Sequence, residues 1–138
     1  TNGADTILIH RLLKEDLDTY VERSKIIQTV EFVSPGIAVA QGEEALTYDS
    51  VLLAQTADIL LSLNDVGASF VIARRHDGLV GISARSLGDI NVQVIMEGLG
   101  GGGHLTNAAT QLEGITIKEA KQKLKDAIIE MTEGSFEK

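Results

Sequence analysis

The spacing of hydrophobic residues changes repeatedly along the chain, and each change marks a new structural element. Apolar residues recur three and four positions apart between residues 12 and 28, which predicts a helix. Two short apolar runs follow, at 29–33 and 37–41, on either side of Ser34-Pro35-Gly36. Because proline and glycine together favour a turn, these runs predict two strands joined by a tight connection.

The rest of the chain continues this pairing of elements. The elements expected after the first two strands are a helix over 50–63, strands over 69–75 and 79–86, a helix over 91–97, a strand over 108–112 and a helix over 116–131. The last helix opens on a capping box, with Thr116 three residues before Glu119. Helices and strands come in pairs rather than in strict single alternation. The pattern therefore predicts an α+β domain with a mixed sheet and helices packed on it.

Residues 69–86 give the clearest strand signal, because Asp77-Gly78 is typical of a two-residue type I′ turn. Such a turn would set Arg74 opposite Gly81 and Phe70 opposite Arg85. The expected core face holds Val71, Ala73, Val80, Ile82 and Ala84, and the other face holds Arg74, Gly81, Ser83 and Arg85 with Phe70, Ile72 and Leu79 among them. A glycine between two arginines leaves room for an anion above the sheet. Alternatively, both arginines are solvated surface residues.

Four consecutive glycines, Gly100 to Gly103, precede His104. Each glycine costs about 0.5–1 kcal/mol relative to alanine in regular structure, so the run calls for a physical reason. Successive backbone amides in such a run can form an anion-binding nest, and a histidine beside it can donate to a phosphate. The alternative is a flexible linker, although the run lacks serine and lies between two regular segments. The spacing matches neither a Walker loop nor the dinucleotide-binding fingerprint.

Composition narrows the function classes. The 138 residues suit one ordinary domain, 43% of them are hydrophobic, and the net charge of −8 argues against duplex DNA binding. Residues 67–107 hold three basic and three acidic residues, so an anion would meet the least repulsion there. The absence of cysteine excludes disulfides and thiolate zinc sites. No membrane-length apolar run or basic leader is visible, so we expect a soluble fragment.

The two motifs together resemble a known family. Ile82-Ser83-Ala84-Arg85-Ser86, followed by Gly101-Gly102-Gly103-His104, is similar to the DHH-associated domain of RecJ-like exonucleases, oligoribonucleases and cyclic-di-AMP phosphodiesterases. The segments 91–96 and 100–111 resemble the membrane-anchored cyclic-di-AMP phosphodiesterases in particular, and Asn107 departs from the alanine of the common pattern. The resemblance implies that residues 1–28 are the end of a DHH domain with a linker helix. Residues 29–138 would form the DHH-associated, substrate-binding domain.

The resemblance also implies which residues bind the substrate. The implied substrate-binding residues are Ser83, Arg85, Gly101, Gly102, Gly103 and His104, with Ser86 and Asn91 as weaker candidates. Arg85 would clamp a phosphate oxygen, for which a guanidinium is well shaped. The implied ligands are cyclic-di-AMP or linear pApA. The implied protein partner is the DHH domain of the same chain, and the apolar helices also allow a homodimer.

The family's hydrolytic chemistry uses two manganese ions, held by aspartates and histidines of the DHH domain. This sequence contains no Asp-His-His motif, and its three histidines, His10, His76 and His104, are scattered. We therefore expect no cofactor, metal ligand or catalytic residue in this fragment, which should bind the dinucleotide without hydrolysing it. The resemblance places the parent protein in the bacterial membrane and this domain on its cytoplasmic side.

Other functions remain open at this point. A single-stranded nucleic-acid-binding domain of a RecJ-like or oligoribonuclease-like exonuclease would need an extended basic track and stacking aromatic residues. The chain has only two tyrosines and three phenylalanines, so this alternative ranks second. A Ser/His/Asp hydrolase would need a nucleophile-elbow motif, which the sequence lacks. A pure dimerisation domain would leave the glycine run unexplained.

Overall fold

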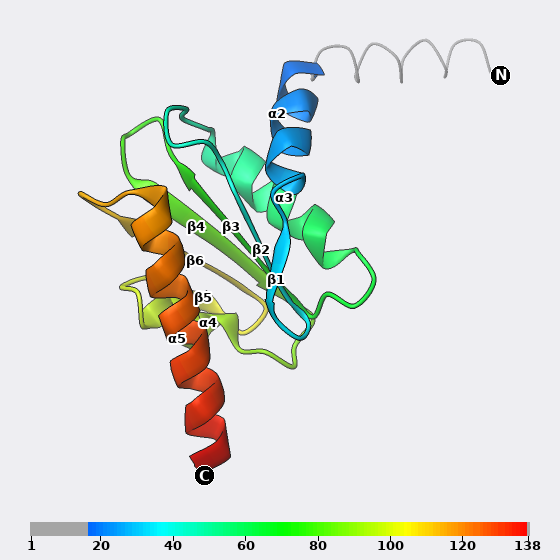
Figure 1. Ribbon diagram of the computed structural model, residues 1–138, viewed down its shortest axis with the longest axis vertical. Coiled ribbons are helices and arrows are strands. Elements are labelled where there is room, and N and C mark those ends of the chain that lie inside the picture. Colours follow the sequence, from blue (N-terminus) through cyan, green and yellow to red (C-terminus); the bar gives the residue numbers. More distant parts are fainter. Residues whose placement is uncertain (1–16, 138) are drawn as a thin grey trace, which may run out of the picture.

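In the computed structural model, which describes residues 17–137, the chain folds into a six-stranded mixed sheet with helices on both faces (Figure 1). In chain order the elements are α2 (Leu17–Ile27), β1 (Glu31–Ser34), β2 (Ile37–Gln41), α3 (Ser50–Leu61), β3 (Ala68–Arg74), β4 (Val80–Ser86), α4 (Val92–Glu97), β5 (Gly102–His104), β6 (Asn107–Leu112) and α5 (Ile117–Glu137). The strands are ordered β1-β2-β3-β4-β6-β5. The α+β class and mixed sheet predicted from the sequence are confirmed.

The first half of the sheet is built around a helical crossover. β1 and β2 pair antiparallel across the Pro35-Gly36 turn, and β2 and β3 pair parallel, joined by α3. Asp49 is the N-cap of α3, since its carboxylate accepts a hydrogen bond from the Val51 amide at 2.8 Å. A parallel pair requires such a crossover, and the crossover helix must pack back on the sheet. It packs on β3 and β4, and α2 contacts β2.

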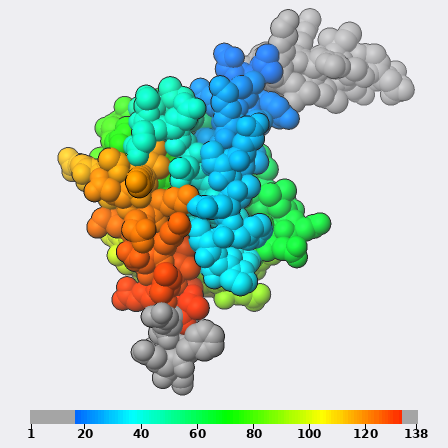
Figure 2. All heavy atoms as spheres, viewed as in Figure 1, coloured from blue at the N-terminus to red at the C-terminus, as the bar shows by residue number. Residues whose placement is uncertain are grey.

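Two apolar clusters hold the helices on the two faces of the sheet. On the α3 face, α2 and α3 pack on Ala40, Val71 and Ala73. On the other face, α4 and α5 pack on residues from β2, β3, β4 and β6, including Phe70, Ile72 and Ile82. In the space-filling view α5 and the α2–β1 segment lie side by side on one side of the molecule (Figure 2). The central strands are therefore buried from both sides.

The β3–β4 hairpin forms where it was expected, but its predicted register is wrong by one residue. Arg74 pairs with Val80 and Ala73 with Gly81, so Arg74 lies on the α5 face and Gly81 on the α3 face. The connection has three residues rather than two: the Arg75 amide donates to the Leu79 carbonyl, and the Gly78 amide donates to the Arg75 carbonyl. Gly78 takes φ +87°, which makes this a type I turn closed by a glycine bulge.

The correction redistributes the side chains of the hairpin between the two faces. Phe70, Ile72, Val80, Ile82 and Ala84 belong to the core beneath α4 and α5. Val71, Ala73, Gly81, Ser83 and Arg85 share the α3 face, as their pairing shows. The predicted pairing of Arg74 with Arg85 on one surface is therefore not found. The Arg74 guanidinium instead donates to the carbonyls of Gly78 and Ile115.

The remaining predictions differ from the structure mainly at the ends of elements. The short strand β5 was not expected, and α5 continues beyond the predicted end to Glu137. Residues 1–16 lie outside the described part of the chain, and with them the predicted start of the first helix, the end of a preceding domain and His10. Over residues 17–137, no helix is both long and apolar enough to cross a membrane.

Candidate functional site

The α3 face of the sheet is covered over its first strands and open over its last ones. Every residue of β3 except Arg74 is buried, whereas β6 alternates between buried and accessible positions. Ala108 and Thr110 of β6 point into the α4–α5 side and are buried, while Asn107 and Gln111 on the opposite face are exposed. Such alternation is typical of a strand with one face on the core and the other in solvent.

Strand register places the predicted residues in two rows on this uncovered surface. Arg85 pairs with Asn107, and Asn107 pairs with His104, so their side chains project from the same face. The neighbouring row holds Ser83, Ala109 and Gly102. These six residues are called the open face below. Since adjacent strands lie about 4.8 Å apart, Arg85 and His104 are separated by roughly 10 Å across the sheet.

A shallow groove of about 210 Å³ runs beside the open face. One wall is the start of α3, with Ser50, Leu53 and Ala54, and the floor comes from β4 and β6. Arg75 closes one end: a Cβ placed on Gly81 would come within 3.0 Å of the Arg75 side chain. The side chain of Arg75 therefore fills the space above Gly81, and the open space expected there between Arg74 and Arg85 is not found.

Arg85 is held firmly on this surface. Its Nε donates to Asp58 Oδ1 at 2.8 Å and its Nη1 donates to the Ala84 carbonyl at 2.9 Å. The Arg85 side chain is only 13% exposed, whereas Asp58 is 61% exposed. The guanidinium therefore lies mostly against protein, with a water-facing carboxylate on one edge, and charge-assisted bonds of this kind are short and directional.

The glycine run has a structural role that the anion-nest interpretation did not foresee. Gly100, at φ +85°, ends α4: its amide donates to the Glu97 carbonyl, and the Gly101 amide donates to the Met96 carbonyl at 2.8 Å. This is the Schellman pattern, in which a left-handed glycine closes a helix. Two of the four glycine amides are thus already used. The next three residues, Gly102 to His104, form β5 and pair with β6, so the ladder uses part of their amides as well.

The middle of the run packs closely against β6. A Cβ on Gly101 would meet the Ala109 carbonyl oxygen at 2.2 Å, and one on Gly103 would meet the Asn107 carbonyl oxygen at 2.5 Å. A Cβ on Gly102 would meet nothing within 4 Å. Gly101 and Gly103 therefore let β5 approach β6, while Gly102 leaves free space on the open face.

Backbone bonds fix the turn that carries His104 and Asn107. The Leu105 carbonyl accepts from the Val92 amide at 3.1 Å, and the Thr106 carbonyl accepts from the Ser86 amide at 3.0 Å. The turn is thereby tied both to the start of α4 and to the end of β4. His104 itself is exposed. Its position relative to Arg85 is set by sheet geometry rather than by a flexible loop.

Four of the predicted residues lie outside the open face: Gly101 and Gly103, which pack closely against β6, and Ser86 and Asn91. Ser86 is 4% exposed and lies on the opposite face of β4, where its Oγ accepts from the Gly88 amide. Asn91 is the N-cap of α4, and its side chain accepts from the Val94 amide. Both side chains complete the backbone hydrogen bonding around the site. The structure thus brings together Ser83, Arg85, Gly102 and His104, and leaves Ser86, Asn91, Gly101 and Gly103 apart.

Comparison with known proteins identifies the family. The family model described as DHHA1 domain matches residues 35–133. The chain belongs to the DHHA1 domain family. It is 59% identical over 132 residues to cyclic-di-AMP phosphodiesterase GdpP of Geobacillus thermodenitrificans, covering 96% of this chain and 20% of that protein. It is 56% identical over 126 residues to cyclic-di-AMP phosphodiesterase PdeA of Listeria monocytogenes, covering 91% and 19%.

The DHHA1 chain therefore spans about a fifth of the length of these curated relatives. Solved structures share its fold at low identity. An exopolyphosphatase-related protein of Bacteroides fragilis superposes with a TM-score of 0.62 at 19% identity, covering 91% of this chain and 44% of that one. The pGpG-specific phosphodiesterase PggH of Vibrio cholerae gives a TM-score of 0.56 at 15% identity, covering 87% and 42%. No finding favours the single-stranded nucleic-acid alternative.

Potential metal ligands are dispersed in the described part of this DHHA1 domain. Within residues 17–137, no three histidine or acidic side chains come together in a way that could hold a metal ion. His76 forms a hydrogen bond with Thr47 at 2.9 Å on the connection between β3 and β4, and His104 lies on β5.

Sequence reasoning missed three residues that shape this site. Asp58 lies 27 positions from Arg85, so no local pattern could connect them. Asn107 was noted only as a departure from the family pattern, although it lies between Arg85 and His104. Arg75 could have been found by considering a three-residue turn, which moves Arg75 rather than Arg74 onto the face of Gly81.

Proposed function

We propose that this chain is the substrate-recognition half of a phosphodiesterase that hydrolyses cyclic-di-AMP to pApA, and that the open face receives the dinucleotide. The observation that carries the proposal is the row formed by Arg85, Asn107 and His104 across three strands. The row offers a cation, an amide and an imidazole on one surface, which suits a ligand with phosphate, sugar and base groups. The relatives named cyclic-di-AMP phosphodiesterases support this choice of ligand.

Each part of the open face has a proposed task. Arg85 binds a phosphate oxygen through the guanidinium nitrogens that its protein contacts leave available. His104, roughly 10 Å away, binds a second polar group of the ligand, and Asn107 bonds to a group between them. The second row of the open face has only small residues, so a sugar or base can approach the sheet closely there. These residues are Ser83, Ala109 and Gly102.

The groove beside the open face is incomplete as a nucleotide pocket. Its volume of about 210 Å³ is below the roughly 300–1,000 Å³ of ordinary ligand pockets. We propose that the DHH domain of the same chain supplies the opposite wall and the manganese ions that activate the attacking water. The residues described here bind and orient the ligand. The parent protein is proposed to be membrane-anchored, with this domain on the cytoplasmic side.

A titration of the chain with cyclic-di-AMP, linear pApA and single-stranded RNA, followed by amide chemical shifts, tests the proposal. We expect saturable shifts for one or both dinucleotides on residues of β4, β5 and β6. Arg85→Ala should weaken binding about 10- to 100-fold, since a hydrogen bond to a charged group contributes about 1.5–3 kcal/mol. Loss of the ion pair with the 61% exposed Asp58 should cost at most about 1 kcal/mol. The packing of the 13% exposed Arg85 side chain is lost as well, so the variant's amide spectrum must show that it is folded before its affinity is compared.

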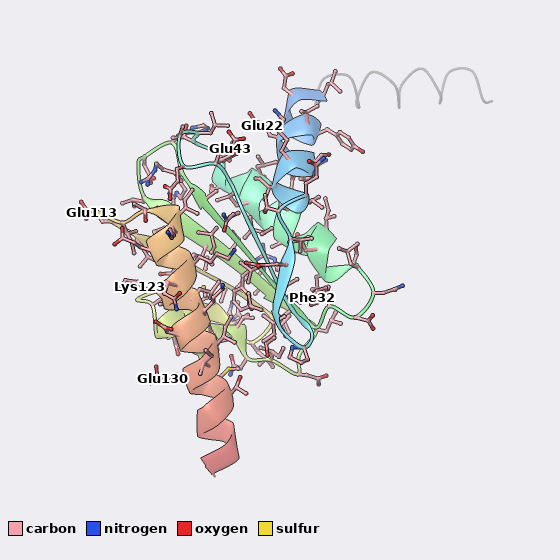
Figure 3. The ribbon with its side chains drawn as sticks, viewed as in Figure 1. Glu22, Phe32, Glu43, Glu113, Lys123 and Glu130 are labelled. Carbon is pink, nitrogen blue, oxygen red and sulfur yellow. The ribbon has the colours of Figure 1, made fainter. Side chains whose placement is uncertain are left out.

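Lys123→Ala is the matched control, because it removes one positive charge from the exposed side of α5 (Figure 3). If Lys123→Ala weakened dinucleotide binding as much as Arg85→Ala, net charge alone would explain the loss of affinity, and the proposal would be overturned. Preferential binding of RNA over both dinucleotides would support the exonuclease-type alternative. Addition of manganese to this chain should give no hydrolysis of cyclic-di-AMP, and turnover would refute the assignment of the metals to another domain.

A further inference from the structure

The contact between Asp58 and Arg85 joins the middle of α3 to the open face. Asp58 accepts from Arg85 Nε at 2.8 Å, and no second bond between the two side chains accompanies it among the described contacts. The bond uses the Nε position alone. Arg85 is also a lining residue of the groove beside the open face.

The position of Asp58 is itself fixed by the sheet. Ser69 is the β3 neighbour of Arg85 in the same cross-strand row, and it is fully buried. Its hydroxyl donates to the carbonyl of Ala57 at 2.7 Å, one residue before Asp58. This bond anchors α3 to β3 at the turn from which Asp58 projects, so the carboxylate cannot move along the sheet without breaking a buried hydrogen bond.

We infer that Asp58 is a positioning residue: it holds the Arg85 guanidinium in the orientation that binds a phosphate of the ligand. The inference rests on the proposed function of the open face. An arginine side chain loses rotamer freedom when it is fixed. Because Asp58 fixes it before the ligand arrives, the ligand meets an ordered guanidinium and binding does not bear that ordering cost.

Charge and positioning predict opposite effects for the loss of Asp58. A carboxylate beside a phosphate site repels the ligand, so its removal would tighten binding if charge alone mattered. Positioning predicts the reverse for Asp58→Ala, because Arg85 would then be free to rotate. Asp58→Asn separates the two effects: it removes the charge but keeps an oxygen that can accept from Arg85 Nε.

The test compares three variants by titration with cyclic-di-AMP and pApA. We expect Asp58→Ala to raise the dissociation constant roughly two- to tenfold, the range for ordering one long side chain. Asp58→Asn should bind at least as tightly as the wild type. Glu130→Gln removes an equal charge from an exposed position on α5 and should leave affinity unchanged (Figure 3).

A second readout follows Arg85 without ligand. In the wild type the Nε–H signal of Arg85 should be resolved and rigid by nitrogen relaxation, in Asp58→Asn it should persist, and in Asp58→Ala it should become mobile. Unchanged rigidity in Asp58→Ala, or tighter binding by both variants, would overturn the inference. If no dinucleotide binds the wild type, the proposed function fails. The mobility of Arg85 in Asp58→Ala then still decides whether Asp58 positions it.

Discussion

Strands β3 and β6 belong to one sheet, yet they differ in what covers them. β3 is buried on both faces, between α3 on one side and α5 on the other, and its residues from Ala68 to Ala73 are all inaccessible to solvent. β6 is buried on one face only, and its other face carries Asn107, Ala109 and Gln111. The same backbone arrangement thus serves as core in the middle of the sheet and as a surface near its edge.

The difference follows from the length and position of the crossover helix. α3 has 12 residues and joins β2 to β3, and it packs over β3 and β4, whereas α2 contacts β2 on the same face. No helix of residues 17–137 comes next on that side, because the connections after β4 lead to α4 and α5 on the opposite face. Small and polar residues fill the uncovered positions. We call the part of the sheet around β3 the closed half and the part around β5 and β6 the open half. The comparison predicts that substitutions in the closed half will change stability and that substitutions in the open half will change ligand binding.

The largest effect should come from the centre of the closed half. Phe70 is completely buried, and Phe70→Ala should lower the free energy of unfolding by about 3–5 kcal/mol, because it removes apolar contact area and leaves a cavity. Denaturant unfolding measures this change. Gln111→Ala, on the exposed face of β6, should change stability by less than about 0.5 kcal/mol. Similar losses for the two variants would erase the distinction between the halves.

The second effect tests the edge of the open half. Gly101→Ala should destabilise the fold by about 1–3 kcal/mol, since its Cβ would overlap the Ala109 carbonyl and push β5 from β6. Gly102→Ala is the matched control within the same run and should cost far less, because its Cβ meets open space. Thermal melting of the two variants checks the difference. Equal tolerance at both positions would show that the run acts as a flexible linker.

Local signals allowed much of the fold to be predicted. The capping box is present as expected, since the Glu119 amide donates to Thr116 Oγ1 at 3.0 Å and the Thr116 amide donates to Glu119 Oε1 at 3.1 Å. Both groups lie within four residues, so sequence spacing determines their geometry. The α+β class and the family followed from similar local patterns of spacing and motif.

Other features could not be predicted, because they depend on turn length and tertiary packing, which local sequence patterns do not determine. Asp77-Gly78 fits both a two-residue turn and the end of a three-residue turn, and one residue of difference moves every side chain of a strand to the other face. The glycine run satisfied two demands at once, the end of α4 and the close approach of β5 to β6. The contact of Asp58 with Arg85 required the tertiary packing of α3, which spacing alone does not give.

The smallest expected change in stability concerns Glu44, on the connection between β2 and α3. Glu44 binds the start of α5: its Oε2 accepts from the Lys118 amide at 3.1 Å, and its Oε1 lies 3.5 Å from Arg74 Nη2. The backbone amide of Ile117 is the main cause that lowers the pKa of Glu44 below its ordinary value of 4.5, and Lys118 and Arg74 contribute in the same direction. A lowered pKa means that the folded state favours the ionised carboxylate.

The sign of the pH dependence follows from this direction. The stabilisation is fully present above pH 4.5 and disappears as the pH falls through the lowered pKa of the folded state. Glu44→Gln should therefore melt slightly below the wild type at neutral pH, and the difference should vanish in acid. Melting curves between neutral pH and the acid limit measure it, with the exposed Glu113→Gln as control (Figure 3). Because Glu44 acts on α5, dinucleotide binding at the open face should stay unchanged. A difference in melting that persists unaltered into acid would mean that Glu44 stabilises α5 by packing rather than by charge.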